Sequence, residues 1–183
     1  FSGDFQRAEE RIYTLDYYRG VARRMAGAGA HMLAIKDMAG LVKPGHAAPL
    51  VAAIREAAPG LPIHFHTHST SGVSLATNLA MVDAGCDVVD CAIAAMSENT
   101  SQPNLNAFCA SLMGHPRDTG IDYLALERLD AYWAATRTLY VPFENGMTSG
   151  SARTFEHQIP GGQYSNLMVQ CKSMGLWSRW NDV

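Results

Sequence analysis

The stretch Pro62-Ile-His-Phe-His-Thr-His68 decides the fold of this chain of 183 residues. Residues 62–66 form a short run with apolar side chains, and a polar run that ends at Gly72 follows them. A run of this length suits a buried strand and is too short for a helix. We therefore expect a strand at 62–66 whose carboxyl end carries polar side chains.

Similar strands are predicted on either side of this stretch. His31 to Ile35 precedes it and Asp87 to Ile93 follows it. Residues 5–28, 44–58 and 73–84 show the spacing of helices and are ended by glycine or proline. Strands that alternate with helices in this way indicate parallel β/α units, as in barrel or doubly wound folds. No glycine-rich nucleotide-binding motif follows any strand, which weighs against the nucleotide-binding version.

The second half of the chain has a different pattern. Helices are expected at 104–113, 122–140 and 164–175, and residues 144–162 are rich in Gly, Ser and Thr. No further strand is predicted there. We therefore divide the chain into β/α units at 1–103 and a helical extension at 104–183.

Composition narrows the class of protein. Hydrophobic residues make up 48% of the chain and charged residues 17%, which is typical of a globular domain. The net charge is −3 without a basic stripe, so a nucleic-acid partner is not expected, and no apolar stretch is long enough for a membrane span. The four cysteines are too sparse for a disulfide framework. A chain that starts at Phe1 without a signal sequence is expected to be the interior of a longer protein.

His66 and His68 are the first candidates for chemistry. Alternate side chains of a strand point the same way, so the two imidazoles project from one side and can converge on one cation. Imidazole suits Zn, Mn and other transition metals. Most His-x-His pairs are not ligands, and that alternative stays open on spacing alone. His64 has the same parity but lies deeper, so we interpret it as a packed, hydrogen-bonded histidine.

Lys36 follows the first predicted strand at the corresponding position. A lysine there can form a Schiff base, contact a phosphate, or become a carbamylated metal ligand. A protonated ammonium has only donors and cannot itself bind a metal. Asp37 should face the opposite way and support the loop through hydrogen bonds.

Four segments together resemble the carboxyltransferase domain of the pyruvate carboxylase family. They are Ala34 to Pro44, Pro62 to His68, the Met96 to Pro103 loop with its Thr-Ser-Gln-Pro ending, and Ile159 to Leu167 with its Pro-Gly-Gly-Gln motif. Ser2-Gly3-Asp4 resembles the end of an earlier barrel strand. The resemblance implies an α/β fold that is the C-terminal part of a TIM (β/α)8 barrel, incomplete as given because a closed barrel needs eight strands and ~250 residues.

The family's site carries over residue by residue. Its Zn²⁺ or Mn²⁺ is held by an aspartate on a strand before Phe1, by a carbamylated lysine and by two histidines. The resemblance thus implies Lys36 as a catalytic residue and Lys36, His66 and His68 as metal ligands. Gln163 lies in the motif near the family's biotin pocket. Ser69 stands where the family usually has an aspartate, which removes a carboxylate near the metal.

The resemblance also implies a reaction. Carboxybiotin on a separate carrier domain releases CO2, pyruvate loses a methyl proton, and the enolate captures CO2 to give oxaloacetate. ATP acts at a distant domain outside this chain. A homo-oligomer is implied, located in the bacterial cytoplasm or the mitochondrial matrix. The alternatives are an oxaloacetate decarboxylase α chain, a transcarboxylase subunit, an aldol-type lyase or synthase, or an inactive fragment that binds metal weakly.

Overall fold

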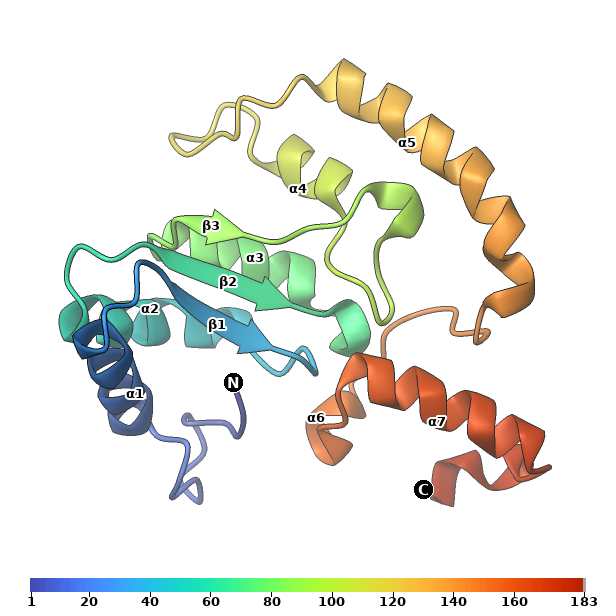
Figure 1. The fold of residues 1–183 in the computed structure, drawn as a ribbon, viewed down its shortest axis with the longest axis horizontal. Helices are drawn as coiled ribbons and strands as arrows, with labels where there is room; N and C mark the ends of the chain where they lie inside the picture. The colour runs from blue at the N-terminus through green and yellow to red at the C-terminus, as the bar shows by residue number, and fades with distance from the viewer. Residues whose placement is uncertain (183) are drawn as a thin grey trace.

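A parallel three-stranded sheet forms the centre of the chain in this computed structural model, which describes residues 1–182 (Figure 1). The strands are β1 (Leu33–Asp37), β2 (Ile63–Thr67) and β3 (Val88–Val89), in the order β1-β2-β3. The helices α1 (Leu15–Gly27), α2 (Ala47–Ala57) and α3 (Ser74–Asp83) alternate with them. The predicted α/β class and the open, partial sheet are confirmed.

The helices cover one face of this sheet. Along β1 and β2 every second side chain is buried, and those of Ile63 and Phe65 belong to a core built with Leu50 of α2 and Met81 of α3. The intervening side chains are exposed or half-buried on the other face. This second face carries the lysine and the histidines.

Two predicted boundaries are wrong. The first helix begins at Leu15 rather than at residue 5, because Thr14 caps it by accepting from Tyr17 N. Upstream of that cap, Glu10 Oε1 accepts hydrogen bonds from Ile12 N and Tyr13 N at 2.9 and 2.8 Å, which fixes a turn. The third strand has two residues instead of the predicted seven, because the chain beyond it turns to form an isolated bridge between Ala92 and Asn104.

Short 3₁₀ helices connect several of these elements. They are η1 (Pro44–His46), η2 (Ser69–Ser71) and η3 (Ala94–Met96).

Two cysteines flank β3, and both are free thiols. Cys86 is buried and Cys91 is half-buried. None of the helices in residues 1–182 combines the length and the apolar character that crossing a membrane requires.

The second half is helical, as predicted. Its elements are α4 (Leu105–Ser111), α5 (Tyr123–Arg137), η4 (Thr138–Phe143), α6 (Thr154–His157), α7 (Gly161–Ser173) and η5 (Trp177–Asp182). A second apolar cluster packs Phe108 of α4 and Leu126 of α5 against Val82 of α3. The division of the chain at residue 103 remains a prediction.

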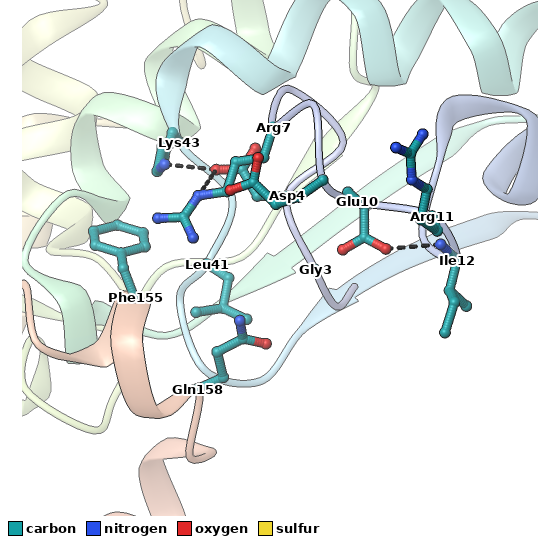
Figure 2. A pocket seen from close by; sticks show the side chains of 11 residues that line it. Gly3, Asp4, Arg7, Glu10, Arg11, Ile12, Leu41, Lys43, Phe155 and Gln158 are labelled. Atoms are coloured by element: carbon teal, nitrogen blue, oxygen red, sulfur yellow. Dashed lines mark hydrogen bonds and ion pairs between the residues drawn. The ribbon is translucent and has the colours of Figure 1, made fainter.

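The helix α6 closes a hollow beside the first residues of the chain. A cavity of about 280 Å³ lies between the 3–12 loop, the β1–α2 connection and α6. Figure 2 shows the side chains that line it. Two of the residues that line it, Lys43 and Phe155, are in contact: Lys43 Nζ lies over the Phe155 ring, 5.2 Å from its centroid. The C-terminal region therefore touches the N-terminal part of the chain.

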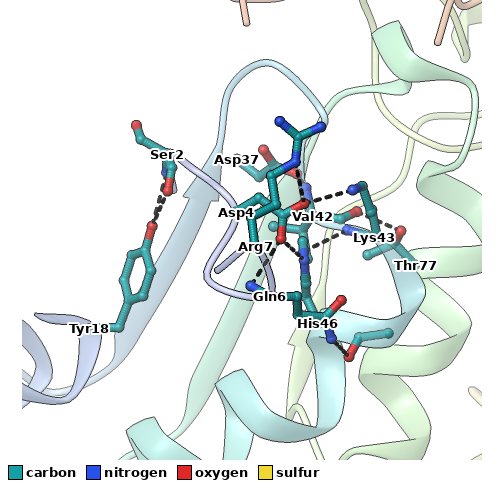
Figure 3. Close-up of polar contacts among 11 residues, drawn as sticks. Ser2, Asp4, Gln6, Arg7, Tyr18, Asp37, Val42, Lys43, His46 and Thr77 are labelled. Carbon is teal, nitrogen blue, oxygen red and sulfur yellow. Dashed lines mark hydrogen bonds and ion pairs between the residues drawn. The ribbon is translucent and has the colours of Figure 1, made fainter. Parts of the chain in front are cut away.

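Asp4 ties the N-terminal segment to the start of α2 (Figure 3). Its carboxylate accepts from Lys43 Nζ at 2.7 Å and from His46 Nε2 at 2.8 Å. His46 is fully buried, and its Nδ1 accepts from Lys43 N. Burial lowers the pKa of His46, so the ring is neutral at pH 7 with its proton on Nε2. Burial raises the pKa of Asp4, but the bonds from Lys43, Gln6 N and His46 outweigh it and lower the pKa to about 2.

Replacing Asp4 with Asn is expected to loosen residues 1–14 at pH 7. The folded-state pKa of about 2 lies below the ordinary 3.8, so the stabilisation is full above about pH 4 and is lost as the pH falls through about 2. We expect local opening to become easier by about 1–2 kcal/mol, measured as amide hydrogen-exchange protection. Near pH 2 the amide protection of residues 1–14 should be the same in the variant and in the wild type. Asp16→Asn, at an exposed ion pair with Arg19, is the control, and equal protection in both variants would contradict the assignment.

Candidate metal centre

The register of the sheet brings Lys36 beside His66. These residues are Cα partners on β1 and β2, and Ala34 and His64 are the preceding pair on the same face. His68 comes directly after the end of β2. The two strands thus place a lysine and two histidines at their carboxyl ends, as the sequence predicts.

The two imidazoles meet edge to face. Their Nε2 atoms are 3.3 Å apart, and their rings are inclined at 81°. His66 Nδ1 lies 2.7 Å from Asp90 Oδ2, and His68 Nδ1 lies 2.7 Å from the carbonyl oxygen of Thr100. Asp90 Oδ2 and Thr100 O can only accept hydrogen bonds, so the neutral form of each ring would carry its proton on Nδ1 and a lone pair on Nε2. Histidines that bind a metal commonly donate the N–H of the other ring nitrogen to a carboxylate or a backbone carbonyl, and both rings have such a partner here.

Asp90 is a candidate site residue that the sequence pattern does not indicate. Its carboxylate bridges two rings, with Oδ1 at 2.8 Å from His64 Nε2 and Oδ2 on His66 Nδ1. Partial burial raises its pKa, but the hydrogen bonds from His66 and His64 outweigh that effect and hold the pKa below its ordinary value. The carboxylate thus fixes both the tautomer and the direction of His66. The sequence does show an acidic residue in the third predicted strand. That this residue contacts His66 depends on the register of the sheet, which the sequence does not show.

Asp37 supports the loop after β1, as predicted. The carboxylate is fully buried and accepts from Leu41 N at 2.8 Å, Val42 N at 2.9 Å and Thr67 Oγ1 at 2.9 Å. Burial raises the pKa of Asp37 above its ordinary value, although these hydrogen bonds act to lower it. The side chain of Lys36 lies on the opposite face of the sheet, the face that also carries His66.

Ser69 lies on the helix side of the site. Its buried hydroxyl is 2.6 Å from Ser74 Oγ at the start of α3. Its backbone N–H donates to Ser101 O at 2.8 Å. The serine thus supports the turn after His68.

The loop at 97–103 is bent to reach His68. Glu98 and Asn99 have φ angles of 68° and 55°, a left-handed conformation that costs non-glycine residues of order 1 kcal/mol. Hydrogen bonds from Glu98 N to Gln102 O and from Ser101 N to Glu98 O hold the bend. The result is that Thr100 presents its carbonyl oxygen to His68 Nδ1.

Gln163 lies in the first turn of α7 and is exposed. This turn begins beside the strand-end loops, because Gly161 N donates to Met38 O at 3.1 Å. The role of Gln163 toward biotin stays a prediction. Within residues 1–182, no three His, Cys, Asp or Glu side chains gather to hold a metal. Lys36, the Cα partner of His66, is the third candidate ligand that the sequence analysis names beside the histidine pair.

Comparisons with known proteins agree with this arrangement. Residues 8–132 match the HMGL-like family, and residues 154–183 match a conserved carboxylase domain. The chain is 45% identical along its whole length to pyruvate carboxylase 1 of Caenorhabditis elegans and to pyruvate carboxylase of Staphylococcus aureus. It spans 16% of the length of each of these relatives.

A solved structure shows the same fold. The carboxyl transferase domain of Rhizobium etli pyruvate carboxylase, with pyruvate and biocytin, is 46% identical and aligns with a TM-score of 0.95. The alignment covers 99% of this chain and 30% of that one. The chain therefore belongs to the HMGL-like family, and along its whole length it resembles the carboxyltransferase domain of pyruvate carboxylases.

Proposed function

We propose that this chain forms the metal-binding part of a carboxyltransferase site, in which CO2 passes from carboxybiotin to pyruvate and gives oxaloacetate. The observation that carries the proposal is the 3.3 Å separation of the Nε2 atoms of His66 and His68, with Lys36 opposite His66 on the neighbouring strand. The names of the relatives and the ligands of the Rhizobium etli domain support the reaction and the substrates.

His66, His68 and Lys36 would hold Zn²⁺ or Mn²⁺. The donor set fits such a metal, since imidazole nitrogen is a good ligand for both. When bound, the metal would supply Lewis-acid stabilisation of the negative charge that develops on pyruvate. The chain's own contribution is orientation: Asp90 and the Thr100 carbonyl hold the two rings with their lone pairs converging.

Lys36 must change chemically before it can bind a metal. Its ammonium form offers only protons, whereas a carbamate made from its amine and CO2 presents an anionic oxygen. Lys36 lies on the face of the sheet opposite the helices, opposite His66 on the neighbouring strand, so a carbamate on its amine would stand beside the histidine pair. A carbamylated Lys36 would add a negative ligand to two neutral ones and thereby strengthen the hold on a divalent cation.

The partners belong to the same proposal. Biotin would arrive on a carrier domain and pass near Gln163 at the start of α7, and ATP would be used at another domain that charges the biotin. A homo-oligomer is part of this proposal. Both relatives reported above are named pyruvate carboxylases, which favours carboxylation of pyruvate over the decarboxylase and transcarboxylase alternatives.

The test replaces both His66 and His68 with Ala in the full-length protein. The metal content, measured by elemental analysis after dialysis, is expected to fall to the background, because two of the proposed ligands are gone. Carboxyl transfer to pyruvate should disappear with it. His115→Ala is the control, since His115 lies at the surface beside Asp83. Undiminished metal in the double variant would defeat the proposal.

A further inference from the structure

His68 is held from outside the sheet. It stands beyond the end of β2, so it lacks the strand pairing that fixes His66. It opens the histidine turn, by which we mean residues 68–72. The location of its ring therefore depends on what packs against this turn, and three glycines from distant segments do so.

Gly40, in the connection after β1, is the first of them. A methyl group on Gly40 would lie 2.4 Å from the carbonyl oxygen of His68 itself. Its φ of +69° also favours glycine. The contact is tightened by a hydrogen bond of 2.5 Å from Ser71 Oγ to Gly40 O. Any side chain at this position would push against the backbone of the metal ligand.

Gly150 and Gly161 approach from the C-terminal region. A methyl group on Gly150 would lie 2.5 Å from Ser69 O, and one on Gly161 would lie 2.7 Å from Thr70 Oγ1. Hydrogen bonds accompany these contacts. Thr70 O accepts from Ser151 N at 2.8 Å and from Thr154 Oγ1 at 3.2 Å. The C-terminal region therefore packs closely on the histidine turn and is bonded to it through the carbonyl oxygen of Thr70.

These contacts do more than bury surface. An added methyl group on any of the three glycines would overlap the histidine turn, so the turn has little room to adjust there, because a packed atom cannot move by an ångström without displacing its neighbours. A shift of the histidine turn would change the 3.3 Å separation of the two Nε2 atoms and the bond from His68 Nδ1 to Thr100 O. The metal pair requires both.

We infer that Gly40 and Gly150 are positioning residues for His68, and that docking of residues 150–161 on the histidine turn sets the metal affinity of the site. This inference rests on the proposed function. It means that residues 150–161 influence metal binding although none of them is a proposed ligand.

The test measures Co²⁺ affinity, by absorption titration of the metal-free full-length protein, in two matched pairs of variants. Gly150→Ala is compared with Gly162→Ala, where a methyl group meets nothing within 4 Å. Gly40→Ala is compared with Gly60→Ala, which has a positive φ of +83° and open space. Gly150→Ala and Gly40→Ala should each weaken Co²⁺ binding about tenfold or more, and both controls should bind as wild type does.

A milder variant distinguishes a loss of metal binding from a failure to fold. Thr154→Val removes the hydroxyl that donates to Thr70 O while keeping the size of the side chain. Its control is Thr136→Val, whose hydroxyl donates to Tyr132 O on exposed α5. Circular dichroism and thermal unfolding in EDTA identify the temperature at which every variant is folded, and Co²⁺ binding is measured there. Thr154→Val should weaken binding several-fold.

Two outcomes separate this inference from the proposed function. If the His66→Ala, His68→Ala double variant keeps its metal, the proposed function fails. If the double variant loses its metal, but Thr154→Val and the folded glycine variants bind Co²⁺ with wild-type affinity, the proposed function stands. In that second case the positioning role of the glycines is overturned, and they serve folding alone.

Discussion

Replacing Lys36 with Arg is expected to reduce carboxyl transfer about a thousandfold in the full-length protein. Arginine keeps the length and the positive charge of the side chain but cannot become a carbamate. The site would then lose its anionic ligand, and with it several kcal/mol of transition-state stabilisation from the metal. The measurement is the rate of carboxyl transfer to pyruvate, together with the metal content of the purified variant.

Lys43→Arg is the matched control, because Lys43 lies in the connection that follows β1 and its ion pair with Asp4 can be kept by arginine. Removing dissolved CO2 gives a second arm of the test. It should weaken metal binding by the wild-type protein and leave the Lys36→Arg variant unaffected. A Lys36→Arg protein that works at the wild-type rate would show that the site needs no carbamate.

Replacing Asp90 with Asn is expected to weaken metal binding about 10- to 100-fold. The carboxylate accepts from both His64 and His66, whereas an amide offers one acceptor oxygen and one donor group. One ring must turn or move its proton. If His66 moves its proton to Nε2, an N–H points at the metal instead of a lone pair. Competition with a chelator for Zn²⁺ measures the loss.

Asp87→Asn provides the comparison from the same segment. Asp87 directly precedes β3, whereas Asp90 directly follows it. The carboxylate of Asp87 accepts from Arg55 and from Ile63 N, not from the imidazole pair. It should bind Zn²⁺ as tightly as wild type does. If Asp90→Asn does so too while its circular dichroism is unchanged, the orienting role of Asp90 is refuted.

The sequence predicts β1 and β2 well because their signals are local. The apolar runs at 31–35 and 62–66 lie within two residues of β1 and β2, and the alternation of side chains places His66 with His68 and sends Asp37 the other way. Parallel order follows from the intervening helices. These features need no knowledge of distant contacts.

Other features depend on contacts that no local pattern carries. The start of α1 is set by Glu10 and Thr14 side chains that compete with helix formation upstream, although the apolar spacing continues through them. Asp90 becomes meaningful only when the register sets it against His66. The spacing of residues does not show that Gly40 and Gly150 face the same turn, because it is the folded backbone that brings them together.

The pairing of Lys36 with His66 has a consequence for how such a protein can change over time. Because side chains alternate along β1, deleting one residue ahead of Lys36 would seat Asp37 opposite His66 and rotate the lysine into the layer of helices. Insertions and deletions between Gly29 and Lys36 are thus far more harmful than most substitutions there. The number of residues in this segment is fixed more tightly than their identity.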